Sequence, residues 1–260
     1  MTEDRGSTRP TAREIYERVI VDARDELERP PSRLAFSGLF AGGTVSFSAL
    51  AVAIALTMLP RADWAPLAAS LLYPIGFVAV IIGRSQLFTE NTLYPVALAF
   101  TERGHVRATA RLWVVVFAAN MAGALLLALL VTQTGALAAP VTDQLAALGT
   151  KMTAGSFAAD FWGAVISGWI LALIAWLVEA AEAAVGQILV VWALALLVGV
   201  GSFDHSVAST LEVFSATLEG SLSVPATLGW LGTAALGNVV GGVGIVAVLN
   251  YGQVKAESSE

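Results

Sequence analysis

The sequence predicts an all-α integral membrane protein with six spans arranged as two three-span halves. Hydrophobic residues make up 57% of the 260 residues and charged residues only 13%, whereas soluble proteins carry about 25% charged residues. The charges gather before residue 33, between the apolar segments and at the C-terminal end. In addition, polar residues interrupt the second and the fifth apolar segments at matching positions. Interrupted membrane helices, one in each half of a chain, point to a substrate pathway near the bilayer midplane.

Residues 1–32 precede the first span and are expected to form an N-terminal tail. An amphipathic helix is predicted over residues 11–29, because apolar residues recur there at helical spacing between Arg and Glu residues. Thr11 is placed to cap this helix, and Pro30-Pro31 is placed to end it. The helix is expected either to pack on the bundle or a neighbouring subunit, or to lie on the lipid surface.

Six apolar segments are long enough to cross a bilayer, which takes about 20 residues. Within a membrane domain of residues 33–252, the expected spans are 35–59, 66–100, 110–136, 156–178, 185–218 and 226–250, with a C-terminal tail at 253–260. Polar residues break the second span at 84–91 and the fifth at 202–206. Non-helical backbone at membrane depth is tolerated only beside protein or a water-filled cavity. Residues 134–155 are expected to be a longer connection on the outer side.

Small residues recur four apart in the first and sixth spans. Gly38 and Gly42 lie in the first span, and Gly237 and Gly241 lie in the sixth. Such spacing lets membrane helices approach each other closely. We therefore assign these glycines to helix packing.

The basic residues predict the orientation of the chain. Arginines are concentrated before the first span and between the second and third spans, and Lys255 follows the sixth. The opposite side carries only Arg61 and Lys151. This excess places both termini in the cytoplasm of a multi-pass protein of the cell (inner) membrane.

Several function classes are not indicated by the sequence. The first 33 residues contain no apolar run of the kind that defines a signal peptide. The chain has no Cys and two His residues, which leaves no convincing set of transition-metal ligands. No nucleotide-binding or catalytic motif is present. We expect no enzyme activity, no cofactor and no nucleic-acid partner.

His205 is the main candidate for chemistry. It lies deep in the fifth segment, between Asp204 and Ser206. Ionisable residues within spans usually face the bundle interior and mark ion or proton routes, and imidazole changes its charge near neutral pH. The alternative is a structural histidine bonded to a carbonyl at a helix end. His105 lies in the loop between the second and third spans and is expected to be solvated.

The first break offers bulky side chains, one hydroxyl and one arginine. Thr89 is placed to donate a hydrogen bond to a passing anion, to cap the second half-helix, or to do both. Helix ends that meet at a break expose amide groups that attract anions. Arg84 is expected either to attract an anion or to pair with a carboxylate, because an unpaired guanidinium at that depth is costly. The carboxylates considered for this pair are Glu90, Glu179, Glu182 and Asp204.

Three motifs resemble those of a known family. Leu87-Phe88-Thr89 resembles a loop that breaks a second span, and the stretch 203–208 (Phe-Asp-His-Ser-Val-Ala) resembles a Phe-Glu-His-Ser-Ile-Ala signature in a fifth. The stretch 236–242, which contains Asn238, resembles a Gly-Asn-hydrophobic-hydrophobic-Gly-Gly motif in a sixth. Over residues 12–252 the chain thus resembles the formate/nitrite transporter family. The resemblance implies an aquaporin-like fold of two inverted three-helix repeats and a homopentamer with one pore per protomer. It also implies passage of small monovalent weak-acid anions.

The resemblance also implies roles for single residues. His205 is similar to the central pore histidine of the family, and Thr89 to the loop threonine that faces it. Residues that the family pattern places at constrictions or slits of the pathway are Leu87, Phe88, Tyr73 and Phe77.

The chain departs from the family pattern at five positions. Gly168 stands where the family often has asparagine, and Val198 stands where it has a bulky pore aromatic. Asp204 replaces the glutamate of the signature, and Ser209 replaces the asparagine that follows it. The loop of the first break also carries Arg84. These departures bear on the choice of substrate, and they leave two alternatives to an anion pathway open. One is a membrane scaffold or sensor that does not transport, and the other is a pore for small neutral solutes.

A bare anion in apolar surroundings costs on the order of tens of kcal/mol. We therefore expect a weak-acid anion to accept a hydrogen bond or a proton near Thr89 and His205 and to cross the slits largely neutral. Asp204 is expected to hold either the histidine ring or the loop backbone.

Overall fold

A computed structural model describes residues 10–102 and 104–257. The described part is all-helical, with six helical segments long and apolar enough to cross a membrane. The predicted all-α class with six spans is confirmed. The helices of the first half are α1 (Ala12–Glu28), α2 (Pro31–Val45), α3 (Phe47–Met58), α4 (Ala65–Ser70), α5 (Pro74–Ile82), the short η1 (Glu90–Thr92), α6 (Tyr94–Thr101) and α7 (Val106–Gln133). Those of the second half are α8 (Ala139–Met152), α9 (Phe157–Ala180), α10 (Ala184–Gly201), α11 (Thr210–Leu218), α12 (Val224–Val239), the π-helical η2 (Val240–Ala247) and α13 (Val248–Glu257).

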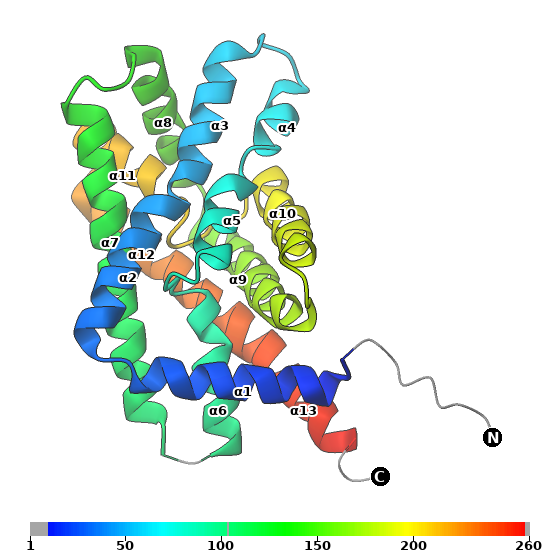
Figure 1. The fold of residues 1–260 in the computed structure, drawn as a ribbon. Helices are drawn as coiled ribbons and strands as arrows, with labels where there is room; N and C mark the ends of the chain where they lie inside the picture. The colour runs from blue at the N-terminus through cyan, green and yellow to red at the C-terminus, as the bar shows by residue number, and fades with distance from the viewer. Residues whose placement is uncertain (1–9, 103, 258–260) are drawn as a thin grey trace.

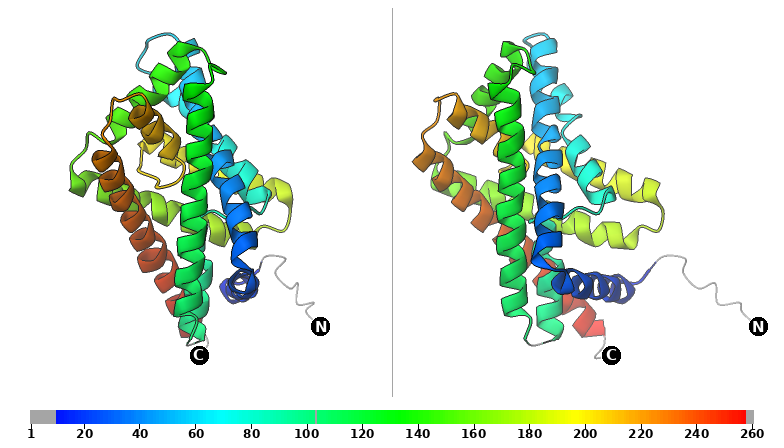
Figure 2. Two further views of the ribbon diagram at one scale, coloured as in Figure 1. Left: turned by 90° about the vertical axis from the view of Figure 1, so that its left-hand side faces the viewer. Right: turned by 60° about the vertical axis from the view of Figure 1, so that its left-hand side comes forward.

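The amphipathic helix α1 lies across one end of the bundle, crosswise to α2 and α7 (Figure 1). Thr11 and Glu14 form a reciprocal capping box at its start, as the sequence predicts for Thr11. Its apolar face is buried against the bundle, and the Tyr16 hydroxyl donates a hydrogen bond of 2.8 Å to the carbonyl of Ala97. Of the two placements expected for this helix, the structure thus shows packing on the bundle. The C-terminal helix α13 contacts α1 at the same end (Figure 2).

The outer connection predicted at residues 134–155 is largely a helix, which the sequence analysis did not predict. Helix α8 begins at Ala139 and carries Pro140 in its first turn, where the missing N–H of proline costs nothing. It packs against α11 and α3 at the end of the bundle away from α1 (Figure 1). A Cβ atom on Gly149 of α8 would lie 2.2 Å from the carbonyl oxygen of Glu212, so only glycine allows this approach.

Both predicted breaks are present, and both half-helices end in the same way. Helix α5 ends before Arg84 (φ 52°), and α10 ends before Ser202 (φ 49°), so each terminator is a non-glycine residue in the left-handed region. The backbone N–H after each terminator donates a hydrogen bond to the carbonyl five residues earlier. These bonds run from Ser85 to Val80 and from Phe203 to Val198. This is the Schellman arrangement. A left-handed non-glycine residue costs about 1 kcal/mol, and both breaks carry that strain at the equivalent position.

Close helix crossings hold each half together. In the first half α2 crosses α7, and a Cβ atom on Gly42 would lie 2.0 Å from the carbonyl oxygen of Asn120. In the second half α9 crosses α12 and η2, and a Cβ atom on Gly241 would lie 2.1 Å from the carbonyl oxygen of Val165. The role of packing predicted for these glycines is confirmed.

Candidate functional site

The two breaks meet inside the bundle at Thr89 and His205. Thr89 Oγ1 lies 3.1 Å from His205 Nε2, and both side chains are fully buried. The rings of Phe77 of α5 and His205 pack edge to face, with their centroids 5.3 Å apart. A hydroxyl and an imidazole from opposite halves of the chain therefore form one polar pair in apolar surroundings.

Backbone hydrogen bonds fix the protonation pattern of the His205 ring. Its Nδ1 accepts from the N–H groups of Val207 (3.2 Å) and Ala208 (2.9 Å), which belong to the turn after the histidine. A nitrogen that accepts these bonds carries no hydrogen, so the neutral ring has its hydrogen on Nε2. That N–H points at Thr89. The pair therefore presents a donor at the place where the two breaks meet.

Asn120 in the middle of α7 clamps the first break. Its Oδ1 accepts from the Phe88 amide at 2.9 Å, and its Nδ2 donates to the carbonyl of Gln86 at 2.9 Å and to that of Gly38 at 2.8 Å. Our reading of the sequence missed this residue. The available signal was an amide side chain in an otherwise apolar span, at the same distance along the chain from Asn238 as Arg84 is from Ser202.

Asn238 in α12 clamps the second break with the same geometry. Its Oδ1 accepts from the Ser206 amide at 2.9 Å, and its Nδ2 donates to the carbonyl of Asp204 at 3.2 Å and to that of Ala164 at 2.8 Å. The Ser167 hydroxyl of α9 also donates to the Asp204 carbonyl. Each loop is thus held on both sides of one residue, and those residues are Leu87 in the first break and His205 in the second.

The Asp204 carboxylate bonds to a tryptophan of α12 and not to the imidazole. Its Oδ1 accepts a 2.8 Å hydrogen bond from the Trp230 indole of α12. Neither carboxylate oxygen bonds to the His205 ring in the described part of the chain. The carboxylate thus ties the second break to α12, and its role in holding the loop backbone stays a prediction.

A cavity of about 790 Å³, which we call the far vestibule, lies at the end of the bundle away from α1. Side chains that line it and bear on the argument are Tyr73, Lys151, Asp160, Val198, Ser209 and Glu212. Asp204, which precedes His205, also lines it. The pathway residues Tyr73 and Val198 predicted from the sequence therefore face this cavity.

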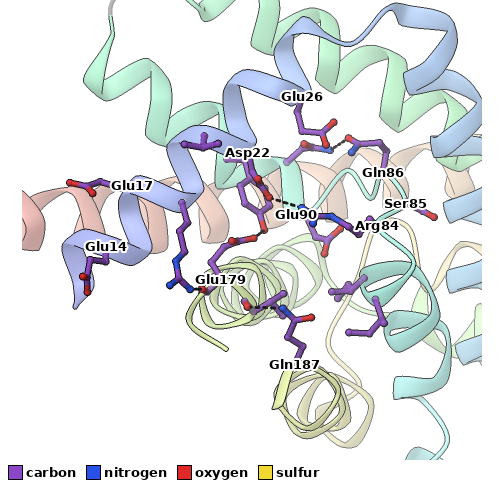
Figure 3. Close-up of a pocket in the computed structure, with 17 residues that line it drawn as sticks. Glu14, Glu17, Asp22, Glu26, Arg84, Ser85, Gln86, Glu90, Glu179 and Gln187 are labelled. Atoms are coloured by element: carbon purple, nitrogen blue, oxygen red, sulfur yellow. Dashed lines mark hydrogen bonds and ion pairs between the residues drawn. The ribbon is translucent and has the colours of Figure 1, made fainter. Parts of the chain in front are cut away.

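A second cavity of about 600 Å³, the near vestibule, lies between α1 and the first break (Figure 3). Residues on either side of the Leu87-Phe88-Thr89 segment, Gln86 and Glu90, line it. Carboxylates dominate its wall, namely Glu14, Glu17, Asp22, Glu26, Glu90 and Glu179, whereas its cations are Arg18 and Arg84. Burial raises the pKa of Glu26 on α1 above its usual value. The Thr89–His205 pair lies between residues that line the two vestibules.

Arg84 lies at the rim of the near vestibule, and its ion-pair partner is not among those that the sequence suggested. Its Nη2 lies 2.9 Å from Asp22 Oδ2 of α1, and its side chain is 77% exposed (Figure 3). The four carboxylates considered from the sequence did not include Asp22, because nothing in the sequence places α1 against the first break. The left-handed backbone of Arg84 ends α5 at this rim.

The remaining predicted residues lie in the packed region between the vestibules. Leu87 and Phe77 are fully buried, and the Phe88 ring packs on Phe117 of α7 with centroids 4.9 Å apart. Gly168 is different, because it lies at the crossing of α9 and α12, where a Cβ atom would lie 2.3 Å from the carbonyl oxygen of Asn238. Helix packing accounts for this glycine, and a place for Gly168 along a pathway stays a prediction.

Comparison with known proteins identifies the family. Residues 13–252 match the profile of a family described as "Formate/nitrite transporter". This chain belongs to the formate/nitrite transporter family. The Inner membrane protein YfdC of Escherichia coli (strain K12) is 31% identical to this chain over 262 residues, which span 99% of this chain and 83% of that protein. A Probable formate transporter of Methanothermobacter thermautotrophicus is 26% identical, over 85% of this chain and 89% of that protein.

Solved structures of the formate/nitrite transporter family share the fold. An "FNT family ion channel" superposes with a TM-score of 0.79 at 20% identity, covering 92% of this chain and 98% of that one. A "Pentameric formate channel with formate bound" gives a TM-score of 0.73 at 18% identity, covering 91% and 98%. At these identities the likeness shows the fold, and it confirms the fold that the motifs predict.

Proposed function

We propose that this chain conducts small monovalent anions of weak acids, such as formate or nitrite, along a path that joins the two vestibules past Thr89 and His205. The observation that carries the proposal is the buried Thr89–His205 pair, 3.1 Å apart, between residues that line cavities at opposite ends of the bundle. The family and its named formate and nitrite transporters support the substrate class.

The chemistry of the pair suits an anion that must lose its charge to cross. The surrounding side chains, such as Phe77 and Leu87, are apolar and fully buried. A bare anion there costs on the order of tens of kcal/mol, whereas a protonated weak acid is neutral. His205 holds its Nε2 hydrogen toward Thr89, so the pair offers a donor to an anion that reaches it. In this mechanism the anion accepts a hydrogen bond or a proton at that point and crosses largely neutral.

The test is flux through the purified protein in proteoliposomes. Formate- and nitrite-driven currents are recorded on solid-supported membranes over a range of pH for the wild type and for H205N and T89V. A hydrogen bond to a charged group contributes about 1.5–3 kcal/mol, so T89V, which lacks the hydroxyl, is expected to lose about 10- to 100-fold in flux. H205N keeps an N–H donor but has no titratable ring, so its pH profile is expected to change. His105 supplies a matched control, because it lies in a loop within 3.3 Å of Glu102, and H105N is expected to behave as the wild type. Unchanged flux and an unchanged pH profile in correctly assembled H205N contradict the mechanism.

The position of Arg84 does not support the scaffold alternative. Such a protein would be supported by an Arg84 that plugs the pathway through a salt bridge. Arg84 instead lies exposed at the vestibule rim, paired with Asp22. Absence of flux for every small monovalent anion, together with co-purifying partner proteins, would favour the scaffold over the channel.

The proposal includes the assembly and the orientation of the chain. The solved formate channel to which this chain is similar is pentameric, and we extend that assembly to this protein in a lipid bilayer. Large apolar side chains exposed on α2 and α3, such as Phe36, Phe40 and Phe47, suit contact with lipid or a neighbouring protomer. Native mass spectrometry tests the stoichiometry. Because the chain has no Cys, single cysteines placed in α1 and in the turn before α4 report sidedness directly. We expect labelling of the α1 site from the cytoplasm alone.

A further inference from the structure

A row of unpartnered polar atoms begins one residue after His205. In the described part of the chain, six buried side-chain oxygens lack a hydrogen-bond partner. Four of them are spaced three residues apart along the second break and α11, on Ser206, Ser209, Glu212 and Ser215. Buried polar groups are nearly always satisfied, by protein or by water. Of the four, Ser209 and Glu212 line the far vestibule, so the contents of that cavity can supply their partners.

Glu212 is the strongest member of this row. It lies in the first turn of α11, is 5% exposed, and lines the far vestibule together with Ser209. Its Oε2 has no hydrogen-bond partner among the described residues. The position in the first helical turn favours a negative charge slightly, but a buried carboxylate with no cation against it is costly, and protonation removes that cost.

The charged groups around Glu212 leave its carboxyl without a counter-ion. Helices α3 and α12, which pack on α11, carry no titratable residue. The titratable residues of α7 are Arg107 and Arg111, next to His105, and those of α8 are Asp143 and Lys151. Elsewhere on the vestibule wall are Tyr73, Asp160 and Asp204. None of these groups forms an ion pair with Glu212 in the described part of the chain.

We propose that Glu212 is a second proton-dependent selectivity residue, which in its protonated form donates a hydrogen bond to a weak-acid anion in the far vestibule. The Ser209 hydroxyl, one turn earlier, supplies a second donor to the same anion. When ionised, the Glu212 carboxylate repels the anion. This inference rests on the proposed function, because it assigns Glu212 to the same pathway. The expected consequence is a loss of flux as the pH on the far side rises and Glu212 loses its proton.

The experiment compares flux against far-side pH for the wild type, E212Q, E212L and E219Q. Gln is a neutral donor of similar shape, so E212Q is expected to keep the flux of the wild type at low pH and to lose much of its decline at high pH. E212L removes the donor and is expected to lose at least tenfold at low pH, where Glu212 of the wild type is protonated, and to show no decline as the pH rises. Glu219, exposed at the end of α11, provides the matched control, and E219Q is expected to follow the wild-type profile. A profile of E212Q that superimposes on that of the wild type overturns the inference.

Infrared difference spectroscopy separates this inference from the proposed function. A protonated carboxylic acid gives a carbonyl band that E212Q lacks and that shifts when formate binds beside it. We expect this band in the wild type at neutral pH, in detergent-purified protein with the elution profile of an intact assembly. Its absence overturns the assignment of Glu212 even when the wild type conducts. If the wild type carries no anion flux but the band is present and titrates, the proposed function fails while the protonated Glu212 stands.

Discussion

Substituting the two clamp asparagines is expected to destabilise the protein unequally, although the two clamps look alike. In N120L the Phe88 amide and the Gln86 carbonyl each lose the partner that Asn120 provides. In N238L the Ser206 amide loses its partner, but the Asp204 carbonyl keeps the hydroxyl of Ser167. The first variant therefore orphans two buried backbone groups and the second orphans one.

The magnitude follows from this count. An orphaned buried backbone group costs about 1–3 kcal/mol. The lower end applies inside a membrane, where unfolded chains also find partners. We expect a loss of about 2 kcal/mol for N120L and about 1 kcal/mol for N238L. For a chain of this size, a loss of 1 kcal/mol lowers the melting temperature by about 2–4 °C.

The assay is the apparent melting temperature of the detergent-purified protein. N250L serves as the control, because Asn250 lies on α13 away from both breaks and is expected to tolerate the change. The double variant N238L/S167A removes the backup bond and is expected to fall to the level of N120L. Equal losses in the two single variants, or no further loss in the double variant, would refute the reasoning that hydrogen-bond partners of the loops set the stability of the breaks.

Two further predictions follow from packing and from titration. G168A is expected to lose about 1–3 kcal/mol of stability through overpacking against the carbonyl oxygen of Asn238. G229A has open space around the new methyl group and is expected to gain up to about 1 kcal/mol of stability from helix propensity. Melting temperatures of the two variants that shift in the same direction would contradict this. Burial raises the pKa of Glu26, so above the unfolded value of 4.5 the folded protein binds more protons than the unfolded chain, and stability falls as pH rises through that window. E26Q is expected to flatten this part of the stability profile, measured as melting temperature against pH.

Features that depend on local composition could be read from the sequence. The apolar segments and the polar residues inside two of them located the spans and both breaks, because hydropathy acts over a window of neighbouring residues. The capping residue of α1 and the helical spacing of its apolar residues could be read from neighbouring residues in the same way. Helix α8 was missed because its first turn holds Pro140 and the segment is too polar for a span. Its buried residues Leu145, Ala146 and Gly149 recur at helical spacing, which is a signal that was available.

Features that depend on contacts between distant segments could not be read in this way. A lone asparagine in an apolar span has no partner visible in the sequence, so Asn120 became meaningful only when α7 was seen against the first break. The same holds for Arg84, whose partner Asp22 lies in another element. Gly168 was placed on the pathway by resemblance, although its neighbour is the backbone of α12. A family pattern gives the position of a residue in the fold, and the contacts decide what the residue does there.

The charge of the near vestibule offers a way to decide whether a bare anion or a neutral acid crosses. Its wall carries more carboxylates than cations, and a negative potential depletes anions while it enriches protons by the same factor. The product of the two concentrations, which sets the amount of neutral acid, is therefore unchanged. Flux that depends on anion and proton together is insensitive to this charge, whereas flux of the bare anion rises when a carboxylate is removed.

Glu17 provides the perturbation, and Asp25 on the same helix provides the control, since Glu17 lines the near vestibule and Asp25 does not. One charge about 10 Å from the anion in water contributes about 0.4 kcal/mol, which is roughly a twofold change in local anion concentration. Because our mechanism takes the substrate across largely neutral, we expect E17Q and D25N to match the wild type in initial flux from the near side at low ionic strength. A twofold rise in E17Q alone, which shrinks at about 0.1 M salt because such fields are then partly screened, would show that the ion crosses with its charge and would exclude protonation at the Thr89–His205 pair.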